Sequence, residues 1–162
     1  MSDCYIYQRK WRMYMNNHPN YRVSVEIILV HEDKILLTKR STNSVVAPGV
    51  WNVPAGKVKF SEIPAEAAIR EVKEETNMDL EGLKEIHVRT FEGQTATERI
   101  YRLIYLYVVN VSEQQLKNFQ LNDEHSEGRW ITREELHSRD FDTLLPAFRS
   151  ILLEKAWNGL LI

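Results

Sequence analysis

Two apolar runs near the start of the chain predict a β-hairpin. Residues 23–30 (VSVEIILV) and 34–40 (KILLTKR) are aliphatic and β-branched, and the polar triplet HED at 31–33 separates them. A connection of this length is typical of a hairpin. Residues 41–50 are then rich in turn formers, and proline and glycine interrupt the extended segment 51–58 (WNVPAGKV). We therefore expect the hairpin to be followed by a shaped loop.

A helical pattern follows this loop. Ser61 is a candidate capping residue, Pro64 falls in the first turn, and the segment 65–76 (AEAAIREVKEET) consists mainly of good helix formers. Asn77 tolerates the left-handed backbone conformation that often ends a helix. The pattern predicts a helix that ends near Asn77.

The second half of the chain predicts three further strands and a helix. Residues 84–91 and 99–109 read as strands joined by a loop through Gly93. The second of these is apolar on both faces, so we expect it in the interior of a sheet. Residues 128–132 (GRWIT) predict a short strand, and 143–157 predict an amphipathic C-terminal helix.

The order of these elements, β-β-β-α-β-β-β-α, predicts the α+β class with a mixed sheet between helices. No Gly/Ser/Pro-rich linker, internal repeat or low-complexity tract divides the sequence. We therefore expect one domain over residues 1–162, with an N-terminal extension at 1–22 and the C-terminal helix at 143–157.

Composition and charge narrow the classes of function. Among 162 residues, 21 are Lys or Arg and 23 are Asp or Glu, and the pI is near 6.2. The chain therefore lacks the broad positive charge that supplies most affinity for duplex DNA. Its N-terminal segment contains no apolar stretch long enough to span a membrane, and Cys4, the single cysteine, cannot form an intramolecular disulfide. These features predict a cytoplasmic protein.

Three glutamates of the predicted helix suggest chemistry. At about 100° per residue, Glu71, Glu74 and Glu75 share one side of the helix. Like charges at this spacing repel by a few tenths of a kcal/mol per pair unless a counter-ion is bound. Carboxylate oxygens are preferred ligands of hard divalent cations. The alternative is a solvated helix face on which Arg70 and Lys73 pair with the acids.

The longer spacing decides between these alternatives. Gly56 is followed after five residues by Glu62, and after seven more by the segment 70–75 (REVKEE). This resembles the signature of the Nudix hydrolase superfamily, G-x5-E-x7-R-E-U-x-E-E-x-G-U, in which U is aliphatic. Asn77 stands where the signature has its final glycine, and we expect activity to tolerate this change. Most of residues 23–137, including the segment 123–130 (DEHSEGRW), is similar to the family's usual framing.

The resemblance implies a fold and an activity. The Nudix fold is a mixed β-sheet sandwiched between α-helices, an α/β/α arrangement. Family members hydrolyse a pyrophosphate bond in nucleoside diphosphate derivatives with Mg²⁺ or Mn²⁺, and water is the nucleophile. By position, the implied metal ligands are the carboxylates of Glu71, Glu74 and Glu75 and the backbone carbonyl of Ala55.

The resemblance also implies supporting roles. Glu62 and Arg70, with Gly56 beside them in the signature, are expected to orient the loop and the helix through a mutual ion pair rather than to touch substrate. The general base is either a glutamate of the signature or a carboxylate from a later loop, where Glu124 is the first candidate and Glu127 the second. Both loop acids have an ordinary alternative as solvated surface charges.

Several residues near the signature are candidates for substrate binding. Arg40, Lys57 and Lys59 have the charge to hold phosphates, although most such residues are surface charges. Trp51 and Tyr105 have rings on which a base could stack, although aromatic residues in extended segments more often pack in a core.

Short features outside the signature bear on the substrate. Family members that act on ADP-ribose tend to have a proline after the signature, and those that act on dinucleoside polyphosphates a tyrosine slightly further on. The corresponding stretch here, 91–96 (FEGQTA), has neither, which argues against both substrates. Residues 36–41, followed by Gly49, resemble an element found in coenzyme A pyrophosphatases. However, Val45 and Val53 stand where that element has an arginine and a phenylalanine, which argues against coenzyme A as the substrate. Elimination leaves a MutT-like hydrolase of nucleoside or deoxynucleoside triphosphates. The alternatives are a nucleotide-sugar or ADP-ribose pyrophosphatase, and a module that senses nucleotides without hydrolysing them.

Family members are often homodimers, and this implies one further expectation. Four aromatic residues of the N-terminal segment are candidates for packing across such an interface: Tyr5, Tyr7, Trp11 and Tyr14.

Overall fold

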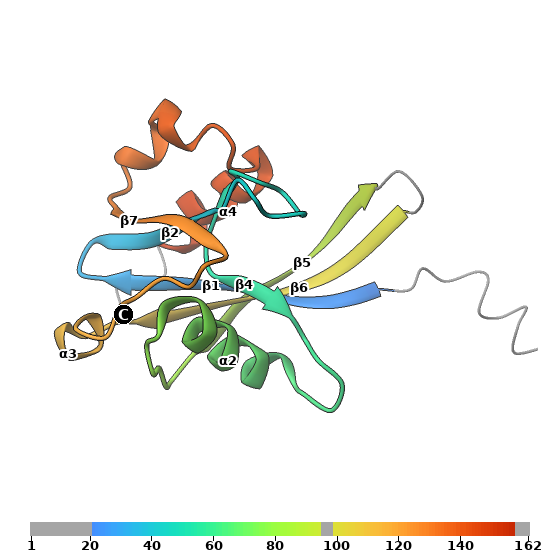
Figure 1. Ribbon diagram of the computed structural model, residues 1–162, viewed down its shortest axis with the longest axis horizontal. Helices are drawn as coiled ribbons and strands as arrows, with labels where there is room; N and C mark the ends of the chain where they lie inside the picture. The colour runs from blue at the N-terminus through green and yellow to red at the C-terminus, as the bar shows by residue number, and fades with distance from the viewer. Residues whose placement is uncertain (1–20, 95–98, 158–162) are drawn as a thin grey trace, which may run out of the picture.

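The computed structural model describes residues 21–94 and 99–157. Cys4 and the N-terminal aromatic residues expected at a dimer interface lie outside these ranges. Within them, a seven-stranded sheet forms the centre of the molecule (Figure 1). Its strands are β1 (Tyr21–His31), β2 (Lys34–Arg40), β3 (Trp51–Asn52), β4 (Ala55–Lys57), β5 (Lys84–Gln94), β6 (Arg99–Asn110) and β7 (His125–Ile131).

The sheet is mixed. Its main path runs β3-β2-β1-β6-β5, while β4 pairs with β1 and β7 pairs with β2. Strands β1 and β6 are parallel, and the other pairs are antiparallel. Strand β6 has a neighbour on each side, which confirms the interior position expected from its apolar faces.

Helices cover both faces of the sheet, which confirms the predicted α/β/α arrangement. Helix α2 (Pro64–Thr76) lies on one face and α4 (Pro146–Lys155) on the other (Figure 1). A one-turn helix, α3 (Glu113–Leu116), follows β6, and two 3-10 turns, Glu135–His137 and Arg139–Phe141, precede α4.

Alternation along β1 produces two separate cores. Ile27 packs in the cluster that contains Val72 of α2, whereas its neighbour Ile28 packs in the cluster that contains Phe148 of α4. Successive side chains of a strand point to opposite faces, so a strand covered on both sides must be apolar at every position. This explains the apolar run at 27–30 (IILV), whose side chains alternate between the two cores.

The predicted hairpin and the predicted helix end are confirmed. Val30 pairs with Ile35 across the β1–β2 turn. Helix α2 ends at Asn77, which has a left-handed backbone (φ 57°) and donates its N–H to the carbonyl of Lys73 at 3.0 Å. Asparagine therefore occupies here the conformation that glycine usually supplies.

Four predicted boundaries are wrong. Ser61 does not cap α2, because Pro64 fixes the first helical position and makes Ile63 the cap. Gly93 does not lie in a loop but in β5, opposite Ile100, with the ring of Phe91 against it.

The C-terminal helix begins at Pro146 rather than at residue 143, because Thr143 has a different partner. Its hydroxyl oxygen accepts a hydrogen bond from the N–H of Trp51 at 3.1 Å. Strand β7 also begins earlier than expected, at His125, because its ladder with β2 continues to Arg40. Among the described residues, no helix combines the length and the apolar character needed to cross a membrane.

Candidate functional site

Helix α2 carries the three glutamates next to strand β4. The adjoining side of the helix is anchored in the core by Ala68 and Val72. Glu75 is almost fully buried, the side chain of Glu71 is 13% exposed, and that of Glu74 is 49% exposed. The carboxylates therefore extend from the protein interior to solvent along one side of α2.

Strand β4 brings a backbone group to Glu75. Ala55 lies opposite Glu26 of β1, while the N–H of Ile27 bonds to the carbonyl of Pro54. Because antiparallel ladders alternate, the polar backbone groups of Ala55 point away from β1. Its N–H donates to Oε2 of Glu75 at 3.3 Å. The expected backbone ligand and an expected carboxylate ligand therefore adjoin.

Gly56 makes room for Glu71. A Cβ atom at residue 56 would lie 1.8 Å from Cδ of Glu71 and 2.0 Å from its Oε1. The carboxylate of Glu71 thus lies directly against the backbone of β4, a position that any side chain at residue 56 would fill. The glycine of the signature is needed for this close approach.

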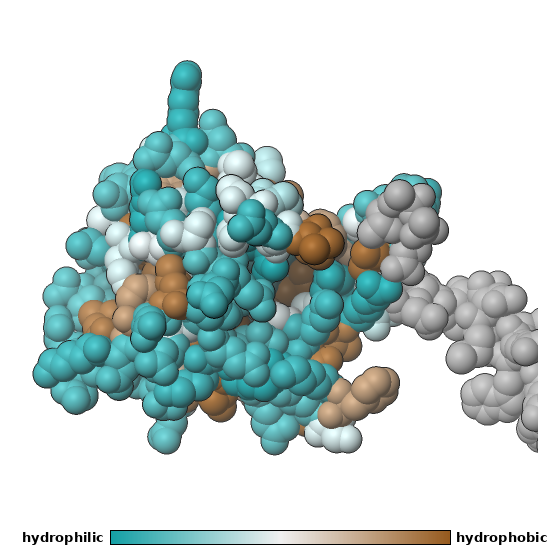
Figure 2. All heavy atoms as spheres, in the orientation of Figure 1, coloured by the Kyte–Doolittle hydropathy of each residue, from teal (hydrophilic) through white to brown (hydrophobic). Residues whose placement is uncertain are grey.

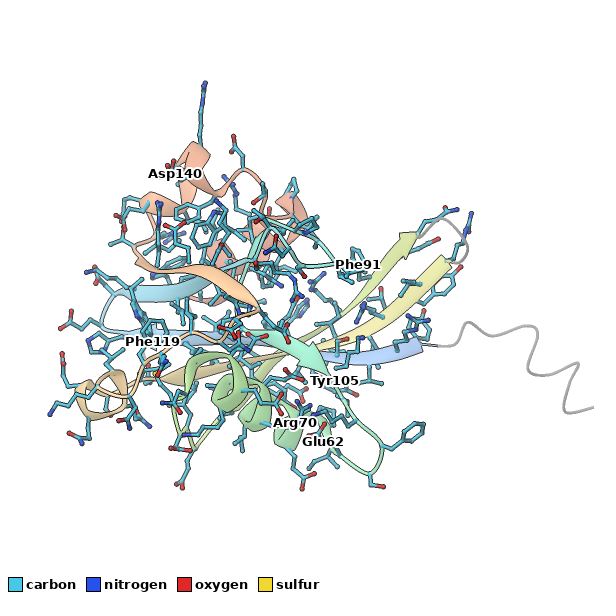
Figure 3. All side chains as sticks on the ribbon, in the orientation of Figure 1. Glu62, Arg70, Phe91, Tyr105, Phe119 and Asp140 are labelled. Atoms are coloured by element: carbon cyan, nitrogen blue, oxygen red, sulfur yellow. The ribbon has the colours of Figure 1, made fainter. Side chains whose placement is uncertain are left out.

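Arg70 connects the loop before α2 to the helix carboxylates. Its Nε and Nη2 donate to the two oxygens of Glu62 at 2.7 and 3.0 Å, and Nη2 also donates to the carbonyl of Lys57 at 2.9 Å. Its Nη1 donates to Glu71 at 2.6 Å and to Glu74 at 3.0 Å. Figure 3 shows Glu62 and Arg70 side by side at α2.

The two members of this ion pair have shifted pKa values. The hydrogen bonds that Glu62 accepts from Arg70, together with one from the backbone N–H of Lys59, lower the pKa of Glu62 to about 2. The same pair raises the pKa of Arg70. Both groups are therefore charged at any physiological pH.

Glu75 has the opposite electrostatics. Burial raises its pKa to about 8, and the nearby charge of Glu71 contributes to this shift. Burial also raises the pKa of Glu71. Two adjacent buried carboxylates are unfavourable as free anions, and a divalent cation among them would remove both the repulsion and the cost of burial. The donor set is oxygen only, so these residues fit Mg²⁺ or Mn²⁺.

The segment after α3 docks on the C-terminal end of α2. Backbone N–H groups of Gln120 and Asn122 donate to the carbonyls of Thr76 and Glu75 at 3.0 and 3.2 Å. Carbonyls at a helix C-terminus lack partners within the helix, so this loop satisfies them. The docking carries the next residues of the loop to the carboxylates of α2.

Glu124 and Arg40 meet beside the carboxylates of α2. The guanidinium Nη2 of Arg40 lies 3.5 Å from Oε2 of Glu124, and the N–H of Ser41 donates to the carbonyl of Glu124 at 2.8 Å. The side chain of Glu124 is 62% exposed, and its charge acts on Glu75. The structure thus brings both predicted residues to the site.

His125 also lies at the site, although no sequence pattern predicted it. Its side chain is buried, and its Nε2 lies 3.9 Å from Oε2 of Glu75, while Nδ1 contacts the side-chain oxygen of Asn122 at 3.1 Å. Burial lowers the pKa of His125, and Arg40 lowers it further. His125 belongs to no motif with a fixed spacing to other candidate residues. Its position next to Glu124 is therefore the one feature of the sequence that points to it.

A buried ion pair behind β4 was likewise not predicted from the sequence. Arg89 of β5 binds both oxygens of Glu26 on β1, at 2.6 and 3.2 Å, and both side chains are nearly buried. Glu26 is an acid placed directly before the apolar run 27–30 (IILV), and this was the available signal.

Three expected residues have other roles in the structure. Trp51 is 2% exposed and packs edge-on against Phe141, so it is not a platform for a base. Tyr105 is half-buried and packs against the core cluster that contains Val72 of α2, and Figure 3 labels it just above Arg70; this contact favours packing over stacking. Glu127 lies in β7 rather than in a loop and pairs with Arg129, which leaves Glu124 as the loop carboxylate at the site.

Lys57 and Lys59 lie on the solvent-exposed side of the site. The side chain of Lys57 is exposed, and Nζ of Lys59 lies 3.5 Å from Glu74. In Figure 2, the surface over α2 is mainly hydrophilic. This surface suits a charged ligand.

Comparisons with known proteins agree with this geometry. The family model described as NUDIX domain matches residues 20–151. The chain is 26% identical to Nudix hydrolase 25 of Arabidopsis thaliana, over 85% of this chain and 87% of that protein. It is 32% identical to the nucleoside triphosphatase NudI of Enterobacter sp. (strain 638), over 71% of this chain and 84% of that protein.

A solved structure is similar over almost its whole length. The MutT NUDIX hydrolase of Burkholderia pseudomallei superposes with a TM-score of 0.66 at 25% identity, covering 85% of this chain and 98% of that one. The similarity therefore extends beyond the signature to most of the chain.

Proposed function

The chain belongs to the Nudix hydrolase superfamily, as a Nudix pyrophosphohydrolase acting on nucleotide derivatives, and we propose that it hydrolyses nucleoside or deoxynucleoside triphosphates with Mg²⁺, or Mn²⁺ in its place. The observation that carries the proposal is the set of oxygen donors on α2 and β4. Similarity to a nucleoside triphosphatase over most of both chains supports this substrate class.

The proposed metal ligands are the carboxylates of Glu71, Glu74 and Glu75 and the carbonyl of Ala55. When bound there, Mg²⁺ supplies two effects: it lowers the pKa of water and offsets negative charge on phosphate oxygens. Arg70 holds Glu71 and Glu74 by direct hydrogen bonds, and Glu62 fixes Arg70. These positions need no rearrangement of the helix for ligand binding.

The remaining charged residues act on water and phosphate in this proposal. Glu124 accepts the proton of the attacking water as a general base. Water attacks phosphorus, a P–O–P bond breaks, and the bridging oxygen leaves with one of the phosphate products. Arg40 and Lys57 bind phosphate oxygens by charge-assisted hydrogen bonds.

A substrate screen with Glu75→Gln tests the proposal. We expect Mg²⁺-dependent hydrolysis of at least one nucleoside triphosphate, and a loss of about 100-fold or more in E75Q, since even an outer-sphere partner of a metal ligand commonly contributes 10–100-fold. Phosphate and pyrophosphate release measure the rate, and circular dichroism confirms folding. Glu81→Gln, at an exposed acid outside the site, is the matched control.

Other outcomes of the screen have a definite meaning. Hydrolysis of nucleotide sugars or ADP-ribose alone would replace the proposed substrate class. Binding of nucleotides without hydrolysis of any of them would favour a sensing module. Equal rates in wild type and E75Q would contradict the proposed site.

Glu124→Gln tests the assignment of the general base. General bases contribute about 10²–10⁴-fold to a rate, so we expect kcat to fall within that range while substrate binding changes little. A decrease of only a few fold would transfer the role to a glutamate of α2.

We also propose a cytoplasmic homodimer, as the family resemblance and the single cysteine suggest. A monomeric mass by light scattering at working concentration would contradict the dimer, and recovery in a membrane or secreted fraction would contradict the location.

A further inference from the structure

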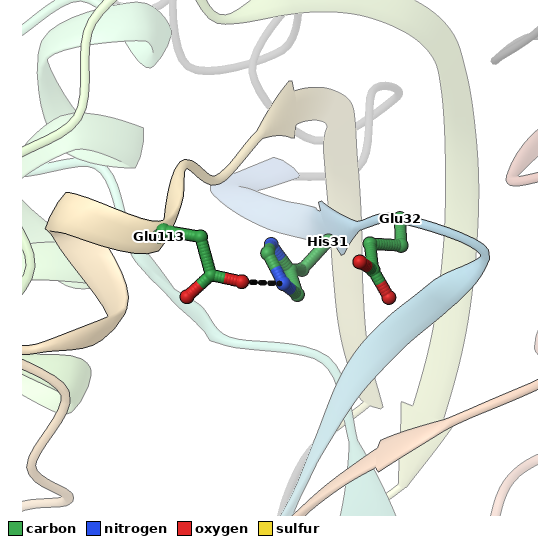
Figure 4. A group of neighbouring side chains, drawn as sticks. All are labelled: His31, Glu32 and Glu113. Atoms are coloured by element: carbon green, nitrogen blue, oxygen red, sulfur yellow. Dashed lines mark ion pairs between the residues drawn. The ribbon is translucent and has the colours of Figure 1, made fainter.

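A second group of potential metal ligands lies at the β1–β2 turn. It contains His31 at the end of β1, Glu32 in the turn, and Glu113 in the first turn of α3 (Figure 4). One ligand atom from each of the three lies within 4.8 Å of the other two. The group shares no residue with the carboxylates of α2.

The parallel pairing of β1 and β6 brings these residues together. Val30 pairs with Asn110, and the N–H of Val111 donates to the carbonyl of Val30 at 2.6 Å, so the two strands end side by side. The turn after β1 and the helix after β6 therefore adjoin. Ser112 caps that helix, and Glu113 is its first residue.

The backbone determines which nitrogen of His31 can bind a ligand. Nδ1 lies 2.8 Å from the carbonyl oxygen of Val111. A carbonyl oxygen only accepts hydrogen bonds, so Nδ1 must carry a proton. The edge contact with Trp130 further restricts the ring. This is the orientation that protein metal sites use: one nitrogen held by a carbonyl, the other free to coordinate.

The free nitrogen faces carboxylate oxygen. Nε2 of His31 lies 3.3 Å from Oε1 of Glu113. In the neutral ring, the Nε2 lone pair would face an anionic oxygen, which is favourable only if a proton or a cation lies between them. Ligands about 2.0–2.1 Å from a tetrahedral zinc ion are separated by about 3.3–3.4 Å, which agrees with the observed distance.

We propose that His31, Glu32 and Glu113 bind a divalent transition-metal ion of the zinc class. Imidazole nitrogen with carboxylate oxygen suits zinc, whereas Mg²⁺ prefers oxygen alone. With neutral imidazole, two carboxylates balance the charge of the ion. The ion would connect the β1–β2 turn to α3, two segments about 80 residues apart in the sequence.

Zinc titration of His31→Gln tests the proposal. In mildly alkaline buffer, wild type should bind one more equivalent of Zn²⁺ than H31Q in a competition titration with a chromophoric chelator. His137→Gln, at an exposed histidine outside the group, is the matched control and should bind as wild type. Loss of an outer-sphere partner commonly lowers metal affinity about 10–100-fold, so Glu113→Gln should lower it at least as much.

A second measurement identifies the ligand atom. The ¹⁵N resonance of His31 Nε2 should shift on addition of Zn²⁺ and not on addition of Mg²⁺. Equal zinc stoichiometry in wild type and H31Q, or an unshifted Nε2 resonance, would contradict the proposal and leave His31 and Glu113 as a side-chain pair without a metal ion. Mg²⁺-dependent hydrolysis should be the same in H31Q and wild type, so failure of this proposal is distinguishable from failure of the proposed function.

Discussion

At the scale of single residues, the site depends on a missing side chain. The carboxylate of Glu71 occupies the space where residue 56 would have its Cβ atom. Arg70 holds that carboxylate on its other side. The position of Glu71 is therefore fixed from two directions, one of them steric.

Gly56→Ala should separate stability from activity. The atoms in the way are the end of a flexible side chain, so the chain can fold by moving Glu71 aside, at a cost of about 1 kcal/mol or less. Displacement of a catalytic group by about 1 Å can cost about 100-fold in rate, and we expect a loss of this order in kcat. Urea denaturation and phosphate release measure the two effects. Unchanged activity would show that the approach of Glu71 to β4 is not needed.

At the scale of elements, the end of α2 organises the site. Asn77 turns the chain in a left-handed conformation, and its side-chain amide donates to the carbonyl of Asn118 at 3.2 Å. The loop held in this way continues to Glu124. One helix end therefore positions carboxylates from two distant parts of the sequence.

Asn77→Val should destabilise the protein, whereas Asn77→Gly should not. Valine resists the left-handed region, at a cost of about 1–2 kcal/mol. Glycine accepts this conformation and loses only one side-chain hydrogen bond, so N77G should remain within about 1 kcal/mol of wild type. Chemical denaturation measures both variants. A stability loss in N77G as large as that in N77V would make the bond to Asn118, not the backbone conformation, the main contribution.

At the scale of the whole molecule, negative charge is concentrated at the site. Residues 62–75 contain five glutamates against Arg70 and Lys73, a local formal charge of −3 in a chain of net charge −2. The near-neutral net charge of the chain is therefore compatible with one strongly acidic region. A bound divalent ion would make this region attractive to an anionic substrate.

This concentration should make the stability of the metal-free protein depend on pH. Burial raises the pKa of Glu75 from 4.5 to about 8. Between these values the folded chain retains a proton that the unfolded chain has lost, so the free energy of unfolding falls as pH rises. The slope is at most about 1.4 kcal/mol per pH unit.

Glu75→Gln should remove this dependence, because glutamine is neutral at all pH values. With a chelator present to remove metal ions, the free energy of unfolding of E75Q should rise relative to that of wild type as pH increases from about 5 to about 8. Glu81→Gln is the control and should follow wild type. Urea denaturation at several pH values measures the effect. Parallel stability curves for wild type and E75Q would contradict it.

The sequence by itself determined the sheet, the central helix and the α2 carboxylates. The alternation of apolar positions, helix propensity and fixed motif spacing are local properties, so they can be recognised in the sequence without knowledge of the tertiary structure. The same information placed Ser61 and Gly93 wrongly, because the exact cap and the strand end depend on Pro64 and on pairing with β6.

Only the tertiary structure decided which distant residues join the site. It buried Trp51 against Phe141 and placed Glu127 beside Arg129, and it brought His125 to Glu75. Trp51 is buried because the turn that contains Phe141 packs against β3, whereas the positions of Glu127 and His125 follow from the register of β7 on β2 and from the docking of a loop on the end of α2. Strand register and loop docking depend on contacts between segments far apart in the chain, and no local pattern records them.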